Sequence, residues 1–134
     1  MAGGLLSSTN DMTRLAAAAA GIPSVQSLPV PAAMAAGFTT AETPYACEAH
    51  NPSLTDRPFG NWQSGLAWAV KTADTVSDFP KVATKNGALP GFSSQIVAVP
   101  SRQLAVVVLI NSDTTEPADT IAFDTAHNLV LALP

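Results

Sequence analysis

The stretch GFSSQIVAVPSRQLAVVVLI, residues 91–110, decides the fold class. Its first half alternates in part, with one face made by Phe92, Ser94, Ile96 and Ala98 and the other by Ser93, Gln95, Val97 and Val99. Residues 100–103 carry turn chemistry. Residues 104–110 are apolar throughout, which is typical of a strand that is buried on both faces. The stretch therefore predicts a β-hairpin whose second strand needs cover on both sides.

Towards the N-terminus the pattern stays β for some distance and then breaks. Residues 65–71 and 81–86 each predict a strand, so strands are expected within 64–111. Residues 22–62 hold six prolines, and proline removes backbone donors and fixes φ. We expect a long loop there, with a short helical turn at 32–37.

Both ends of the chain predict helices. Ser8 and Asp11 have the spacing of a helix-capping pair, and Gly21 supplies a stop signal, which together predict a helix over 9–20. Pro117 suits a first helical turn, and a helix is expected over 117–133. The fold class is therefore α+β, an antiparallel sheet flanked by helices, in one domain spanning residues 1–134.

Composition excludes several classes of protein. The chain has 134 residues, is 12% charged and carries a formal net charge of −4, so no nucleic-acid surface is expected. No apolar run is long enough for a membrane span, and residues 1–6 do not resemble a signal peptide. Cys47 is the only cysteine, and neither His50 nor His127 has partners at ligand spacing. No metal site and no cofactor are predicted.

The residues that carry chemistry are Lys85-Asn86-Gly87-Ala88, followed by Gly91-Phe92. They resemble the Lys-Thr-Gly motif of serine β-lactamases and penicillin-binding proteins, most closely in the class C branch with its D-alanyl-D-alanine carboxypeptidases and esterases. Three further segments resemble family segments in the same order: residues 3–12, Gly65-Leu66-Ala67-Trp68 and residues 117–133. The resemblance implies the C-terminal part of a β-lactamase/transpeptidase-like fold.

The resemblance also implies roles for these residues. Lys85 would place a positive charge near the nucleophile and the substrate carboxylate, and the Ala88 N–H would stabilise the oxyanion. Gly87 would let the backbone lie close to the substrate, and Asn86 and Gly91 complete the implied substrate-binding set. Asn86 stands where the family has Thr or Ser, and its amide can still donate to a carboxylate.

The family's nucleophile motif, Ser-x-x-Lys, is absent from this sequence. The residues three positions before Lys71, Lys81 and Lys85 are Trp68, Asp78 and Val82. The second family motif is also missing in context, because Ser8-Thr9-Asn10 is explained by helix capping. In the family both motifs lie upstream of the segment that resembles residues 3–12. We therefore expect a C-terminal fragment of a serine hydrolase that is inactive alone and has a half-built core, since the family places its terminal helix on one side only.

The complete enzyme would act through an acyl-enzyme on a D-Ala-D-Ala peptide, a β-lactam or an ester, and intact relatives would be periplasmic or secreted. Two other readings stay open. In these alternatives the chain would be a carboxylate-binding module without turnover, or an interaction fragment. The strand at residues 104–110 is expected to have one unpaired edge, which would recruit a separate N-terminal chain or a second copy.

Overall fold

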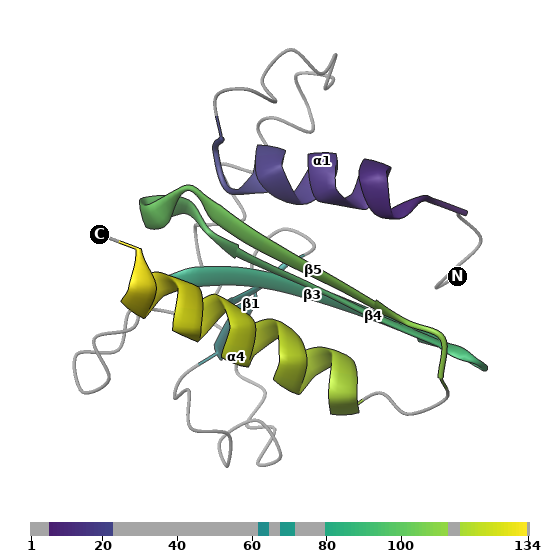
Figure 1. The fold of residues 1–134 in the computed structure, drawn as a ribbon. Coiled ribbons are helices and arrows are strands. Elements are labelled where there is room, and N and C mark those ends of the chain that lie inside the picture. Colours follow the sequence, from purple (N-terminus) through teal and green to yellow (C-terminus); the bar gives the residue numbers. More distant parts are fainter. Residues whose placement is uncertain (1–5, 23–61, 65–67, 72–79, 113–115, 134) are drawn as a thin grey trace.

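The computed structural model is an α+β fold, as the sequence predicted (Figure 1). It describes residues 6–22, 62–64, 68–71, 80–112 and 116–133. The described elements are helix α1 (Thr9–Ala19), strands β1 (Trp62–Ser64), β2 (Ala69–Lys71), β3 (Val82–Leu89), β4 (Phe92–Val99) and β5 (Leu104–Ile110), the 3₁₀ turn η2 (Pro100–Arg102), and helix α4 (Glu116–Ala132). The helical turn expected at 32–37 and most of the loop expected at 22–62 lie outside the described residues.

The strands form one antiparallel sheet in the order β1-β2-β3-β4-β5, which is also their order along the chain. Strand β3 is longer than the 81–86 expected from the sequence. Asn86-Gly87 has the composition of a turn, but both residues pair with β4, opposite Gln95 and Ser94. The chain instead reverses at Pro90-Gly91, where Gly91 has a φ of +82° that suits the third position of a type II turn.

Helix α4 and one face of the sheet make the main hydrophobic core. Because side chains alternate along a strand, every second residue of β3, β4 and β5 points toward this helix. The buried members of the core are Val82, Val97, Val99, Val106, Ala122, Phe123, Ala126 and Val130. This face binds the last helix of the chain to the β3–β4–β5 meander.

Helix α1 lies on the opposite face of the sheet from α4 (Figure 1) and contacts β5 and β4. Its buried side chains are those of Ala16, Ala17 and Ala20, which let the helix backbone approach the sheet closely. The two helices therefore cover β5 from both sides. The expectation of a half-built core does not describe this part of the sheet, because the N-terminal helix supplies the second layer.

Both ends of α1 are closed by local hydrogen bonds. The Ser8 Oγ accepts from the Asp11 backbone N–H at 3.2 Å and donates to the Asp11 carboxylate at 2.7 Å. At the other end, the N–H of Gly21 donates to Ala18 O and that of Ile22 to Ala17 O, a Schellman arrangement made possible by the φ of +70° at Gly21. The capping pair that the sequence indicated thus fixes where the helix begins.

A small polar cluster is buried on the α4 face of the sheet. It consists of Thr84, Ser93 and Gln95, each at most 5% exposed. The Thr84 hydroxyl donates to Ile96 O at 2.7 Å and accepts from the Gln95 amide Nε2. No described protein group donates to the remaining Gln95 oxygen, Oε1.

Candidate functional site

The site predicted from the sequence falls on the last five residues of β3 and the turn that follows. Strand β2 pairs only with residues 82–84 of β3, whereas β4 pairs with residues 83–89. Beyond Thr84, β3 therefore has no described neighbour on its β2 side. Residues 85–89 are all exposed, while Val82, Ala83 and Thr84 are buried.

Strand alternation divides the four motif residues between the two faces of the sheet. Thr84 belongs to the α4 face, where it bonds Gln95. Lys85 and Gly87 therefore lie on the α1 face, and the Asn86 and Ala88 side chains lie on the α4 face. The side chains of Lys85 and Asn86 therefore leave the strand in opposite directions.

The backbone groups of the motif alternate as well, within the plane of the sheet. The two-residue turn closes on the pair Leu89 and Phe92, and the residues of such a pair exchange both N–H···O bonds. Bonded and non-bonded pairs alternate along an antiparallel ladder, so Gly87 and Lys85 also bond to β4. The N–H groups of Asn86 and Ala88 then point away from β4, to the edge that β2 leaves open.

Gly87 lies close to the Ser94 side chain on the α1 face of this segment. A Cβ built on Gly87 would lie 3.0 Å from the Ser94 Oγ, which donates to Gly87 O at 3.3 Å. Gly91 has a different role, because its positive φ belongs to the turn and an added Cβ would meet nothing within 4 Å. The two glycines expected to bind substrate thus have different roles. Gly87 leaves room for the Ser94 hydroxyl, and Gly91 provides the positive φ of the turn.

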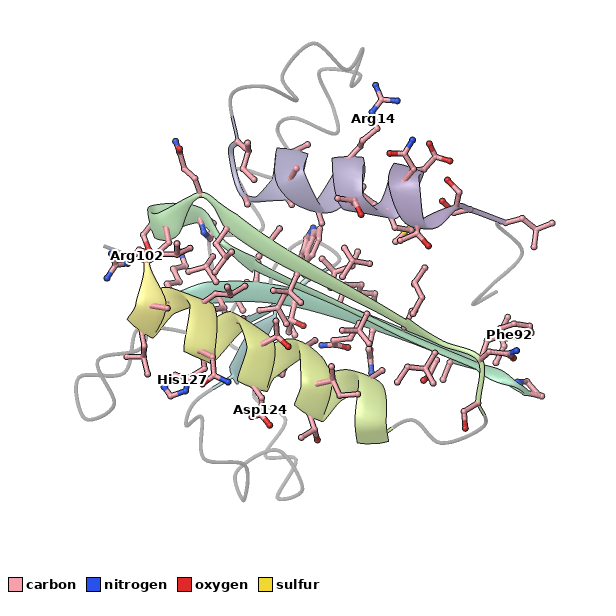
Figure 2. All side chains as sticks on the ribbon, in the orientation of Figure 1. Arg14, Phe92, Arg102, Asp124 and His127 are labelled. Carbon is pink, nitrogen blue, oxygen red and sulfur yellow. The ribbon has the colours of Figure 1, made fainter. Side chains whose placement is uncertain are left out.

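Exposed apolar side chains border the motif at the same end of the sheet. Leu89 is 54% exposed, Phe92 61% and Leu109 44%, and the alternation places all three on the face of Lys85. Figure 2 shows Phe92 at the tip of the hairpin, at the end of the sheet opposite Arg102. The site therefore combines one cation, two edge N–H groups that no described strand bonds, and an apolar border.

The sequence did not predict Ser94, Leu89, Phe92 or Leu109 as site residues, although Phe92 belongs to the quoted motif. The partial alternation of residues 91–99 already put Ser94 on the face of Phe92, but the pairing of β4 with β5 was needed to add Leu109. Ser93 and Ser94 both lie within the β4 ladder, and Ser93 is 4% exposed on the α4 face. Neither occupies the position of an activated nucleophile.

The described part of the chain holds no further candidate for metal binding or membrane insertion. No group of three or more His, Cys, Asp or Glu side chains there is placed to hold a metal ion. Among the described helices, none is both long and apolar enough to cross a membrane. Ser8-Thr9-Asn10 starts α1, as capping predicted, and Ser8 holds the first turn. The candidate site therefore rests on β3 and its turn.

Comparison with known proteins identifies one family. The family model described as Beta-lactamase matches residues 1–131, nearly the whole chain. No curated protein and no solved structure matches the chain.

Proposed function

Because the chain belongs to the beta-lactamase family, we propose that it supplies the cation and the oxyanion-binding edge of a serine hydrolase of the class C and D-alanyl-D-alanine carboxypeptidase branch. The hydrolase would form an acyl-enzyme with a D-Ala-D-Ala peptide, a β-lactam or an ester. This chain contributes Lys85 and the Ala88 N–H, and it is inactive alone because its sequence has no Ser-x-x-Lys.

The observation that carries the proposal is the edge of β3 beyond Thr84, with which no described strand pairs. Attack on a carbonyl places negative charge on its oxygen, and preorganised backbone N–H groups stabilise that charge. The Ala88 N–H points to this edge, and Lys85 stands three residues earlier on the exposed α1 face. A substrate lying along the edge would thus meet a hydrogen-bond donor and a positive charge together.

The position of Asn86 favours substrate binding by its backbone over binding by its side chain. Its side chain lies on the α4 face of the sheet, whereas Lys85 lies on the α1 face. In this proposal the two side chains therefore do not contact the same side of the substrate. Its backbone N–H, like that of Ala88, faces the open edge and is free to pair with an extended substrate. The hydroxyl that the family has here is therefore replaced by an amide whose part in binding is secondary to that of the backbone.

Binding and turnover are tested separately on the isolated chain. A titration with D-alanyl-D-alanine, followed by backbone amide NMR shifts, should move the signals of residues 85–88. Lys85→Met should weaken that binding by about tenfold, the loss of one charge-assisted hydrogen bond. Arg102→Ala is the matched control, because Arg102 is also an exposed cation but lies at the opposite end of the sheet (Figure 2).

Incubation with a fluorescent penicillin, read by mass spectrometry, should leave the chain unmodified. A covalent adduct would overturn the proposed inactivity. Binding without turnover, even when a chain carrying Ser-x-x-Lys is supplied, would favour the carboxylate-binding module. Absence of binding at residues 85–88, with the fold intact by NMR, would remove the substrate role of this edge.

A further inference from the structure

Asn86 is followed by glycine, the residue whose backbone nitrogen is the least hindered. Of the six asparagines in the sequence, only Asn86 precedes a glycine. Because Gly87 has no Cβ and a wide choice of backbone dihedrals, its nitrogen can approach the side-chain amide of the residue before it. Attack by that nitrogen on the Asn86 carbonyl carbon, Cγ, closes a five-membered ring. This dipeptide is therefore the place in the chain where an asparagine reacts most readily with its own backbone.

The ladder between β3 and β4 opposes this reaction. Gly87 forms a bonded pair with Ser94, so its N–H donates to β4, and the strand holds Asn86 in an extended conformation. The Ser94 hydroxyl also donates to Gly87 O at 3.3 Å. The attacking nitrogen must lose its proton and turn toward Cγ, which requires these bonds to open first. The reaction rate is therefore set by how often this end of the hairpin opens.

The structure favours local opening at this end of the hairpin. Residues 85–89 are all exposed, and β2 pairs only with residues 82–84 of the same strand. Among the described elements, β4 alone holds the segment beyond Thr84 to the sheet. Segments with exposed backbone hydrogen bonds and few buried contacts open at a lower free energy than the core. The hairpin end can therefore open while the buried start of β3 stays paired.

We propose that Asn86 and Gly87 form a self-modification site, at which Asn86 is converted to aspartate or isoaspartate when the hairpin end opens. The Gly87 nitrogen gives its proton to a base in solution and bonds to Asn86 Cγ, while the bond from Cγ to Nδ2 breaks and ammonia leaves. Water then adds to one of the two carbonyls of this succinimide. Cleavage between Cγ and the Gly87 nitrogen gives aspartate, and cleavage of the main-chain bond gives isoaspartate. The sum consumes one water and releases one ammonia.

Isoaspartate changes the edge of β3 more than aspartate does. It adds one atom to the main chain before Gly87, because the chain then runs through Cβ and Cγ of residue 86. The direction of each later N–H depends on unbroken alternation along the strand. The Ala88 N–H would then no longer point to the edge that β2 leaves open, whereas Lys85 precedes the change. This consequence rests on the proposed function, in which the Ala88 N–H binds the oxyanion.

Timed incubation of the full chain at mildly alkaline pH tests the modification itself. Peptic mapping in acid, followed by mass spectrometry, gives the conversion at each asparagine, and an isoaspartyl methyltransferase labels the isoaspartate. Asn86 should convert at least about tenfold faster than Asn128, which is also exposed within a regular element but is followed by leucine. Asn86→Gln should stay unmodified at this position, because its ring would need one more atom. Conversion at Asn86 no faster than at Asn128 would overturn the proposal.

Two substitutions separate local opening from global unfolding. Gly91→Ala strains the turn at a φ of +82°, and opening relieves that strain, so conversion of Asn86 should accelerate by about tenfold. Ser8→Ala removes the cap of α1, outside the hairpin, and should leave the rate unchanged. Circular dichroism checks that both variants fold. If Gly91→Ala does not, low urea concentrations replace it, since they accelerate global unfolding and leave a small local opening unaffected. Equal acceleration in the two variants, or a steep rise with urea, would overturn the role of hairpin opening.

The effect on the edge is measured on the isoaspartate form, separated by ion exchange because it carries one more negative charge. In the D-alanyl-D-alanine titration, this form should lose the amide shifts that the unmodified chain shows at residues 85–88. Unchanged shifts would overturn the proposed effect on the edge. An unmodified chain that does not bind, but still converts Asn86, would count against the proposed function and support the self-modification site.

Discussion

At the scale of single residues, the buried hydroxyl of Thr84 ties two strands together. It donates to Ile96 O and accepts from Gln95 Nε2, on a side chain only 5% exposed. Thr84→Val keeps the shape but leaves the Gln95 amide N–H without its acceptor, so we expect the free energy of unfolding to fall by about 1–3 kcal/mol. Urea denaturation measures it, with the exposed Thr13→Val on α1 as the control.

The double variant Thr84→Val with Gln95→Met removes the whole polar pair. Replacing both partners by apolar groups is much less costly than stranding one of them, and the unpaired Gln95 oxygen disappears as well. We expect the double variant to recover most of the lost stability, giving a large coupling energy in the mutant cycle. Additive effects of the two substitutions would show that the pair is not coupled.

Gly91 has a purely conformational role in the turn. Its φ of +82° is strained for any residue with a Cβ, although the space around it is open. Gly91→Ala should therefore lower the free energy of unfolding by about 1–3 kcal/mol. Gly91→Asn should cost less, because Asn tolerates positive φ. Equal losses in the two variants, measured by thermal unfolding, would point to a cause other than φ.

At the scale of elements, the start of α1 depends on one side chain. Ser8→Ala removes the bond to the Asp11 N–H and should cost about 1 kcal/mol of stability. Native-state amide exchange should accelerate first in α1 and less in the β3–β4 hairpin. Ser7→Ala is the control, since Ser7 is also exposed and precedes the cap. Unchanged exchange in α1 would mean that the helix is held by its packing alone.

How far the sequence predicts each element depends on whether its signals are local. The start of α1, its stop at Gly21 and the apolar strand β5 carry their signals within a few residues, and the structure has them within about one residue of the expected positions. The extent of β3 is set by pairing with β4, which overrides the turn composition of Asn86-Gly87. Pattern alone also missed β1, which straddles the boundary between the expected loop and the expected strands, because a three-residue strand has no measurable period.

In the candidate site, the sequence likewise predicted the residues but not the directions of their side chains. The sequence indicated Lys85, Asn86, Gly87 and Ala88 through a motif, and motifs specify residue types without giving directions. That Asn86 points away from Lys85 follows from the register of β3 with β4, which no spacing in the sequence reveals. The apolar border formed with Leu109 also required β5 to be placed beside β4.

At the scale of the whole molecule, the placement of α1 against β5 has a consequence for synthesis on the ribosome. About 85 residues separate the end of α1 from the start of β5. At a translation rate of about 5–20 residues per second, several seconds therefore pass between the synthesis of α1 and that of the strand it packs against. An 11-residue helix is marginal on its own in water. The β3–β4–β5 meander, by contrast, forms from neighbouring hairpins as it emerges. Nascent chains arrested before residue 104 should therefore hold α1 unprotected from protease, and α1 gains its native contacts late although it precedes the sheet in the chain.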